Sequence, residues 1–470
     1  MRQKKDLRLK INNAIKRRVV LMNIGLAHYR VGETDGVSLE MEKWRKVLEK
    51  MGHKVFFISG TPDYGEIYIP EMSFHSERFK KIERNAYKEL SDYANAEEFK
   101  EDILREAGVI EEKLTRVIKE NNIELLVPNN ILSLGVALPV AIAFTRVIKK
   151  LKLKAIAHNH DFYWEREVLS KPTCDFVKEC LEEYYPPKDV NIKQVVINEI
   201  AKKELFKRKG LDSTVVPNVF DFDQPLWKSD EFNQDLREKL GISPNDIVFL
   251  QATRVTDRKA IELAIEVVGE VSRRRQELYG TLYDGREFTP NDRIVMLMPG
   301  LIETATNYVE FLKKVAVDEN VEIIWCNQIM GAERHDSAGE KMYSLWDMYV
   351  VADMITYPSI LEGWGNQFLE GLFAKKNMIV FEYPVYLTDI KPLGFEVISL
   401  GAQYAERKGT GYVEIPREKI IEAANEAIKL LKDEKEYIRR VEKNFAIGQQ
   451  HLSYRTLGNK LKEIISSFNS

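Results

Sequence analysis

Short apolar runs alternate with longer amphipathic stretches along most of this chain, and that rhythm limits the folds it can adopt. The alternation is typical of the parallel sheets of α/β proteins. In the first half the strand candidates are Val19–Ile24, Lys54–Ser59, Leu125–Pro128, Ala155–His158, Val195–Ile197 and Thr214–Val216. In the second half they are Ile247–Gln251, Ile294–Met298, Val321–Trp325, Met354–Tyr357, Met378–Phe381 and Glu396–Ile398.

Helical patterns fill the stretches between these strands. In the first half they include Leu39–Met51, Glu98–Glu120 and Leu134–Lys150. In the second half they include Ala260–Arg274, Tyr308–Val317, Tyr343–Val351, Asn366–Ala374 and Glu418–Leu431, and a last pattern covers Tyr454–Phe468. A chain of 470 residues is too long for one ordinary core. We therefore predict the α/β class with two successive Rossmann-like domains.

The seam between the domains is placed at Val216–Asp221, where a strand ends and turn-forming residues follow. The domains are then residues 1–216 and 217–449. One long segment, Thr61–Ala94, shows no clear sheet rhythm. It is consistent with an inserted lid, an element that recognises a second substrate, or peripheral helices.

Composition excludes several classes of protein. The 70 basic and 73 acidic residues nearly balance, for a net charge of −3, which argues against nucleic acid as a partner. No apolar run approaches the roughly 20 residues that a membrane span needs, and the polar N-terminus lacks a signal-peptide core. The three cysteines have neither metal-ligand spacing nor an even count, so we expect a cytoplasmic protein without a metal site. The oligomeric state stays open.

The stretch Tyr357–Gly371 carries the strongest functional signal. Glu362 lies on a loop with a Gly-aromatic-Gly bend directly after it, and Glu370 lies inside the helix that the loop opens. Gly363 and Gly365 leave their backbone N–H groups accessible, and a helix N-terminus adds partial positive charge at the same place. A diphosphate suits such a site, while two nearby carboxylates suit hydroxyl groups. The pattern predicts a ligand that carries both phosphate and sugar.

This stretch resembles the donor site of retaining glycosyltransferases of family 4, which have the GT-B fold of two Rossmann-like domains facing each other across a cleft. The family's Pro-Ser-x-x-Glu-Gly-Phe-Gly segment is matched here except that Trp364 replaces the usual Phe. The resemblance implies that Glu370 holds the ribose of a nucleotide and Glu362 the donor sugar. It also implies donor contacts for Gly363, Trp364, Gly365 and Asn366, and a C-terminal helix, residues 450–470, that returns to the acceptor-side first domain.

A dense polar and aromatic string, Ala157–Arg166, follows a strand of the first domain. Side chains of this kind are costly to bury without a purpose. By resemblance, a histidine here contacts the donor sugar near its 6-hydroxyl; His160, next to Asp161, is the better match and His158 the alternate. The competing interpretations are a hydrogen-bonded structural histidine and a metal site, against which the absence of matching ligand spacing elsewhere argues. Asn129 and Asn130, which also follow a strand, are candidates to face the same cleft.

Two cations follow the first strand of the second domain. The family keeps an Arg and a Lys about five positions apart there, and Arg254 and Lys259 match that spacing. The resemblance implies that they clamp the donor diphosphate, with Arg258 able to exchange roles with Arg254. Two cations would stabilise a departing nucleoside diphosphate without a metal ion.

The loop after the first strand, Gly25–Ser38, corresponds to a Gly-rich loop near the diphosphate in the family. The usual Gly-Gly doublet is absent, and Gly25 and Gly32 are the candidates for donor contact. An ordinary strand–helix loop is the alternative.

The resemblance implies a retaining hexosyltransferase that moves a hexose from a nucleotide sugar, GDP-mannose or UDP-glucose, to a small soluble or carbohydrate acceptor, with no cofactor or metal required. The string His158–Arg166 is similar to that of a subset of family members that make soluble glycosides, with mannosylglucosylglycerate synthesis as one candidate activity. The alternatives are a glycoside phosphorylase or sugar-nucleotide epimerase of the same fold, and a non-catalytic sugar-nucleotide binder.

Overall fold

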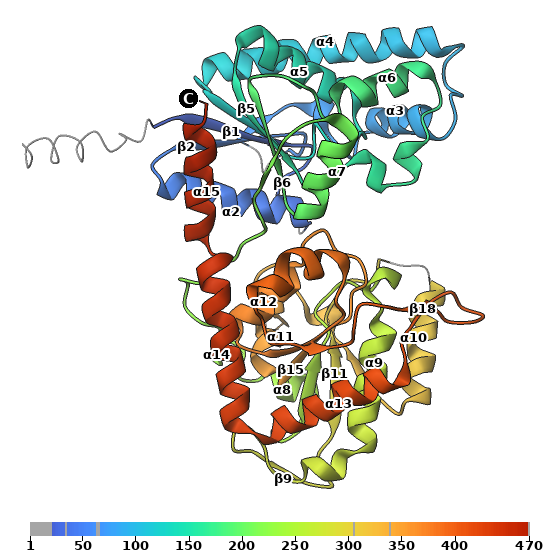
Figure 1. Cartoon of the computed structure of the whole chain (residues 1–470), viewed down its shortest axis with the longest axis vertical. Coiled ribbons are helices and arrows are strands. Elements are labelled where there is room, and N and C mark those ends of the chain that lie inside the picture. Colours follow the sequence, from blue (N-terminus) through green and yellow to red (C-terminus); the bar gives the residue numbers. More distant parts are fainter. Residues whose placement is uncertain (1–20, 33–34, 63–65, 304–305, 338–339, 469–470) are drawn as a thin grey trace, which may run out of the picture. The chain divides into compact units, whose positions relative to one another are not determined.

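The computed structural model describes residues 21–32, 35–62, 66–303, 306–337 and 340–468. The chain forms two compact units (Figure 1). The first unit extends to Val195 and takes in the residues from Leu461 onward, while the second spans Val196–Lys460. The seam predicted from the sequence, Val216–Asp221, lies one helix and one short strand later than this boundary.

The first unit carries the strands β3-β2-β1-β4-β5-β6 of a seven-stranded sheet, in which β3, β2, β1, β4 and β5 pair in parallel. The seventh strand of this sheet, β7 (Thr214–Val215), follows β6 in the strand order and lies after Val195 in the chain. The strands are β1 Asn23–His28, β2 Lys54–Ser59, β3 Ile67–Tyr68, β4 Leu125–Pro128, β5 Lys154–Asn159 and β6 Ile192–Val196. The helices are α2 Gly36–Lys50, α3 Glu77–Tyr87, α4 Ala96–Glu120, α5 Leu138–Leu151 and α6 Asp175–Tyr184, with short turns η1 Pro70–Met72, η2 Tyr163–Glu165 and η3 Val168–Ser170. The predicted strand Val19–Ile24 lies partly outside the described residues.

The second unit contains a six-stranded parallel sheet in the order β12-β11-β8-β15-β16-β17. Its strands are β8 Ile247–Leu250, β11 Ile294–Met298, β12 Glu322–Trp325, β15 Met354–Tyr357, β16 Asn377–Val380 and β17 Ile398–Ser399. The α-helices are α7 Glu199–Lys209, α8 Leu236–Lys239, α9 Ile261–Arg273, α10 Thr306–Asp318, α11 Leu345–Val351, α12 Asn366–Phe373, α13 Arg417–Lys432 and α14 Glu434–His451. Helix α15 Tyr454–Ser466 runs across the boundary between the units.

Smaller elements complete the second unit. The short strands are β7 Thr214–Val215, β9 Gly280–Thr281, β10 Glu287–Phe288, β13 His335–Ser337, β14 Glu340–Met342, β18 Ala405–Glu406 and β19 Val413–Glu414. The short turns are η4 Asp257–Lys259, η5 Arg275–Leu278, η6 Asn327–Ile329, the π-helical η7 Tyr386–Ile390 and η8 Lys391–Leu393.

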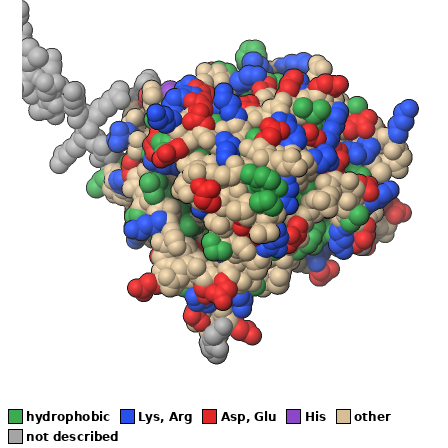
Figure 2. All heavy atoms as spheres, turned by 90° about the horizontal axis from the view of Figure 1, so that it is seen from below, with side chains coloured by type: hydrophobic (Ala, Val, Ile, Leu, Met, Phe, Trp, Pro, Cys, Tyr) green, Lys and Arg blue, Asp and Glu red, His purple; other side chains and the backbone are tan. Residues whose placement is uncertain are grey.

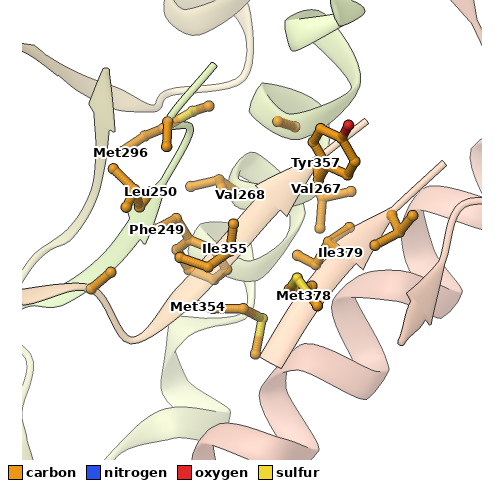
Figure 3. Packing of buried hydrophobic residues seen from close by; sticks show 14 of the residues in the cluster. Phe249, Leu250, Val267, Val268, Met296, Met354, Ile355, Tyr357, Met378 and Ile379 are labelled. Carbon is orange, nitrogen blue, oxygen red and sulfur yellow. The ribbon is translucent and has the colours of Figure 1, made fainter. Parts of the chain in front are cut away.

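The central strands are apolar because both faces of each sheet are covered. In the second unit Phe249, Leu250 and Ile355 are fully buried, and Val267 and Val268 of α9 contribute to the same core (Figure 3). Burial on two faces removes the alternation of apolar and polar residues that a half-exposed strand would show. This is why continuous apolar runs identified the strands.

The segment 61–94 contains β3, η1 and α3. Met72, Phe79 and Ile82 are buried in the core of the first unit, and Ser76 caps α3 by accepting a hydrogen bond from the Phe79 N–H. The described part of this segment is therefore packed on the core as short peripheral elements.

Each sheet has a point at which the strand order reverses. In the first unit β1 lies between β2 and β4, and in the second β8 lies between β11 and β15. Open α/β sheets bind ligands at the carboxyl ends of the strands at such a point. A ligand site is therefore expected in the loops after β1 and β4 in the first unit, and in the loops after β8 and β15 in the second.

The face of the molecule shown in Figure 2 carries charges of both signs. On the face shown in Figure 2, Lys and Arg side chains are interspersed with Asp and Glu. No helix among the described residues is long and apolar enough to cross a membrane.

Candidate active site

Lys259 and Glu362 form an ion pair at the reversal point of the second sheet. Lys259 ends η4, in the loop after β8, and Glu362 lies in the loop after β15. Their side chains are only 10% and 9% exposed. Burial lowers the pKa of Lys259, and the neighbouring Glu362 carboxylate opposes that shift. The two residues, predicted to contact different parts of a donor, are in direct contact with each other.

Arg258 joins the two loops. Its Nη1 lies 3.5 Å from Glu362 Oε2 and donates to the Leu361 carbonyl at 3.2 Å, and its own carbonyl accepts from the Ile360 N–H at 3.1 Å. The side chain is half exposed. Glu362 is therefore placed between a buried ammonium and an exposed guanidinium, a cation-rich setting suited to an anionic ligand.

Arg254 has a partner that the sequence analysis did not identify. Its Nη1 lies 2.8 and 3.0 Å from the two carboxylate oxygens of Glu303, and both side chains are partly exposed. The loops that carry them touch through Val255, whose N–H donates to the Leu301 carbonyl at 2.8 Å. Gly300 permits this approach, because a Cβ there would lie 1.9 Å from the Thr253 carbonyl oxygen.

Gly365 is the N-cap of α12 and adopts φ +119°, a conformation that favours glycine. No side chain caps the first turn of this helix. The first N–H groups of a helix need partners from outside it, and together with the helix dipole they attract anions. The position directly follows Glu362, Gly363 and Trp364, as the sequence predicts.

Four buried polar atoms around these loops have no hydrogen-bond partner among the described residues: Thr256 Oγ1, Ser359 Oγ, Trp364 Nε1 and Gln367 Oε1. Unsatisfied buried polar atoms are uncommon in native proteins because each costs about 1–3 kcal/mol. Their concentration beside the Lys259–Glu362 pair is consistent with a polar ligand.

Glu370 lies on α12 and accepts a hydrogen bond from the Tyr349 hydroxyl of α11 at 2.7 Å. Tyr349 is fully buried, and burial raises its pKa well above the ordinary value. The hydroxyl therefore stays a donor that orients one oxygen of Glu370. Asn366, at the start of the same helix, accepts at Oδ1 from Asn218 Nδ2 at 3.0 Å.

In the first unit, polar side chains gather at the carboxyl ends of β1, β4 and β5. His28 Nδ1 lies 2.8 Å from the Asn129 carbonyl oxygen, and His158 Nδ1 lies 2.8 Å from Asn129 Oδ1. Asn130 Oδ1 accepts from the N–H groups of His160 at 2.7 Å and Asp161 at 3.1 Å. Asn129 and Asn130 thus fix the segment from His158 to Asp161 by hydrogen bonds.

The two histidines differ in their surroundings. His158 is stacked on Trp44 with ring centroids 4.2 Å apart, in addition to its contact with Asn129, and burial lowers its pKa well below the ordinary value. His160 is 92% buried, yet its Nε2 has no partner in the described part of the chain. Burial, followed by the charge of His28, lowers the pKa of His160 to about 3. A neutral imidazole with an unsatisfied nitrogen is suited to a sugar hydroxyl.

The other candidate residues of the first unit make contacts with their immediate neighbours or adopt a particular backbone conformation. Gly25 lies within β1, where a Cβ would come 2.9 Å from Ile58 Cδ1, so close sheet contacts explain this glycine. Gly32 adopts φ +83°, and the next two residues lie outside the described part. Glu165 accepts from the Phe162 N–H at 3.0 Å, and Arg166 forms an exposed ion pair with Asp161 at 3.1 Å.

Comparison with known proteins gives two close full-length relatives. The chain is 43% identical over 414 residues to the mannosylglucosylglycerate synthase of Petrotoga mobilis, covering 88% of this chain and 94% of the relative. It is 40% identical over 453 residues to the mannosylglucosylglycerate synthase of Thermotoga maritima, covering 95% and 99%. No family model matches the sequence.

Solved structures share the fold at low identity. A glycosyltransferase from Rickettsia africae superposes with a TM-score of 0.60 at 16% identity, covering 95% of this chain and 98% of that one. The catalytic domain of starch synthase IV from Arabidopsis thaliana, solved with ADP and acarbose, gives a TM-score of 0.58 at 13% identity and covers 95% and 99%. These similarities confirm the predicted GT-B fold class of two Rossmann-like domains.

Proposed function

Because the chain belongs to the family of the mannosylglucosylglycerate synthases, we propose that it transfers a mannosyl group from GDP-mannose to glucosylglycerate with retention of configuration. The chain is a glycosyltransferase, as its relatives at 40–43% identity are. The name of these relatives describes a product in which mannose, glucose and glycerate are joined, and that name carries the proposal. Of the two donors left open by the sequence, a mannosyl donor fits the outer sugar of such a product.

The site of the second unit supports a division of roles for the donor. Glu370, oriented by Tyr349, would accept hydrogen bonds from the ribose hydroxyls. The uncapped first turn of α12, with Gly363, Trp364, Gly365 and Asn366, would face the diphosphate. Lys259 and Arg254 would neutralise it, and Glu362 would accept from hydroxyls of the mannose. Gly25 and Gly32 remain proposed donor contacts, and His160, with His158 as the alternate, remains the proposed sugar contact in the first unit.

The transfer step breaks the bond between the anomeric carbon and the phosphate oxygen, and the electron pair stays on that oxygen. A bond then forms from an acceptor hydroxyl oxygen to the anomeric carbon on the same face. The hydroxyl proton passes to the departing phosphate. Lys259 and Arg254 lower the energy of this step because they stabilise the negative charge that develops on the leaving group. We propose that these cations make a metal ion unnecessary.

The three cysteines form no disulfide, which supports a reducing compartment such as the cytoplasm as the place of this reaction.

The test is a matrix of donors and acceptors with the purified full chain. GDP-mannose and UDP-glucose are each incubated with glucosylglycerate, glycerate or no acceptor, in the presence and absence of EDTA and of inorganic phosphate. The proposal expects one product, of the mass of mannosylglucosylglycerate with an α-linkage by NMR, only from GDP-mannose and glucosylglycerate, and unchanged by EDTA. Consumption of the donor without acceptor would indicate an epimerase, and turnover only with free phosphate a phosphorylase. Transfer from UDP-glucose instead of GDP-mannose would overturn the donor assignment.

A further inference from the structure

Two buried side chains donate hydrogen bonds to backbone carbonyl groups of the Gly363–Gly365 bend. Tyr383, in the loop after β16, donates from its hydroxyl to the Trp364 carbonyl at 2.6 Å. Asn198, the residue before α7, donates from Nδ2 to the Gly363 carbonyl at 2.9 Å. We infer that Tyr383 and Asn198 are positioning residues for glycosyl transfer, which turn the amide N–H groups of the bend toward the donor diphosphate. This inference rests on the proposed function.

The planarity of the peptide bond provides the physical link. Within one peptide unit the carbonyl of a residue and the N–H of the next residue point in opposite directions. Holding the Gly363 carbonyl on Asn198 therefore directs the Trp364 N–H away from Asn198. Holding the Trp364 carbonyl on Tyr383 directs the Gly365 N–H away from Tyr383 in the same manner. The N–H groups of Trp364 and Gly365 therefore both point away from Asn198 and Tyr383.

Both holding residues are themselves fixed. Asn198 is 6% exposed, and its Oδ1 accepts from the Ala201 N–H at 2.7 Å, which makes it the N-cap of α7. Because one amide group makes both bonds, its orientation is determined by the helix as well as by the bend. Tyr383 is fully buried and lies edge-on to Tyr357, with ring centroids 5.9 Å apart.

The same tyrosines lie close to both the bend and Glu362. The Tyr357 ring lies edge-on to that of Tyr383, and the charge of Glu362 acts on the Tyr357 hydroxyl. A Cβ on Gly365 would lie 2.5 Å from the Tyr383 hydroxyl oxygen and 2.7 Å from that of Tyr357, so only glycine allows this approach. Burial raises the pKa of both tyrosines well above the ordinary value, so the hydroxyls stay protonated as donors. The two tyrosines therefore pack against the bend close to the carboxylate that precedes it.

The test uses substitutions that remove a donor and keep the shape. Tyr383→Phe deletes the hydroxyl. Asn198→Asp cannot donate to the Gly363 carbonyl but retains an oxygen for the α7 cap. Tyr386→Phe is the matched control, because Tyr386 is also buried in the neighbouring turn but donates no hydrogen bond to the bend. The readouts are steady-state kinetics for donor and acceptor, GDP affinity by calorimetry, and melting temperature.

We expect Tyr383→Phe and Asn198→Asp each to reduce kcat/KM for the nucleotide sugar about 10- to 100-fold and to weaken GDP binding. The KM for the acceptor and the kinetics of Tyr386→Phe should stay at wild-type values. A purely structural role would lower the melting temperature without this selective effect on the donor. If Tyr383→Phe fails to fold, Asn198→Asp decides alone.

Wild-type GDP affinity and donor kinetics in Asn198→Asp would overturn the inference. A wild-type chain that binds no nucleotide and transfers no sugar would instead refute the proposed function, so the two failures are distinguishable.

Discussion

The Lys259–Glu362 pair places opposite charges where few water molecules reach them. A buried pair contributes little when intact, but removal of one partner leaves an uncompensated charge. Here the lost partner would also be the cation proposed to stabilise the leaving diphosphate. Function and stability are therefore coupled at this residue.

Lys259→Ala should lower the rate of transfer by at least about 100-fold, because a preorganised charge at the leaving group is lost. It should also lower the melting temperature, because Glu362 loses its buried partner. Arg258→Ala is the control: its side chain is half exposed and 3.5 Å from the same carboxylate, so we expect less than about a 10-fold effect on rate. Kinetics of the two variants at one pH provide the measurement. Near-normal turnover in Lys259→Ala would contradict the role of this residue.

Lys152 offers a stabilising substitution away from the site. It is exposed and ends α5 in a left-handed conformation, φ 48° and ψ 38°, that is unfavourable for residues with a Cβ. Lys152→Gly should raise the free energy of unfolding by about 1 kcal/mol, which thermal or denaturant melts can measure. Lys149→Gly, three residues earlier in the helix, should lower it by about 1 kcal/mol. Equal effects at the two positions would show that backbone strain at Lys152 is negligible.

Local motifs identify residues better than they identify contacts. Glu362, Gly363 and Gly365 are adjacent in the chain, so their shared loop can be predicted from the sequence. Lys259 and Glu362 are 103 positions apart and meet only because β8 and β15 are neighbours in the sheet. Glu303 has no motif, and only the pairing of its loop with Val255 brings it to Arg254.

At the scale of elements, α9 is connected to its neighbours through one buried carboxyl group. Glu262 Oε2 accepts from the Tyr308 hydroxyl of α10 at 2.7 Å, and Oε1 accepts from the Val413 N–H of β19 at 2.9 Å. The Tyr308 hydroxyl accepts in turn from the Ile261 N–H at 3.0 Å. The first turn of α9, directly after Lys259, is thereby tied to two other elements.

Burial raises the pKa of Glu262 to about 7, while hydrogen bonds from Tyr308 and the charge of Arg407 oppose the shift. The folded state therefore keeps a proton that the unfolded state releases from pH 4.5 upward. The contribution of Glu262 to stability is fully present below about pH 4.5 and is lost as the pH rises through about 7. Relative to Glu262→Gln, the wild-type protein should lose about 3 kcal/mol of unfolding free energy across this window.

Urea melts of both proteins between pH 4 and 8 would measure this difference. Glu310→Gln on the exposed face of α10 is the control, and its stability curve should run parallel to that of the wild type. A constant difference between wild type and Glu262→Gln would show that Glu262 does not titrate in this range.

Elements with a continuous apolar run or stripe were predictable, and others were not. Strands β2, β4, β11 and β15 have the predicted bounds because each is buried on both faces. Helix α7 was missed, since only Ala201 and Leu205 of it are buried and no apolar stripe results. Its ends nevertheless carry a signal: Asn198 caps the start, and Gly210, with φ 65°, ends it.

At the scale of the whole molecule, α15 contributes to both units. Leu457 belongs to the second unit and Leu461 to the first, although both are buried and lie one turn apart. The sequence analysis expected a returning C-terminal helix only from resemblance, because contacts between the two ends of a long chain leave no local pattern.

Leu461→Ala should destabilise the first unit by about 2–5 kcal/mol, and Leu457→Ala should do so in the second. Hydrogen exchange followed by mass spectrometry measures the two units separately. Faster exchange is expected in β1 and β4 for the first variant, and in β8 and β15 for the second. Identical exchange maps for the two variants would mean that the units unfold as one.

Because the first unit consists of two separate parts of the chain, its two parts are synthesised at different times. The first unit extends to Val195 but is completed only by the residues from Leu461 onward. At about 5–20 residues per second, the 265 residues between these points (461 − 196 = 265) need roughly 13 to 53 s of translation. During that interval the nascent first unit lacks Leu461 and Ile464, two apolar side chains that are buried once the chain is complete.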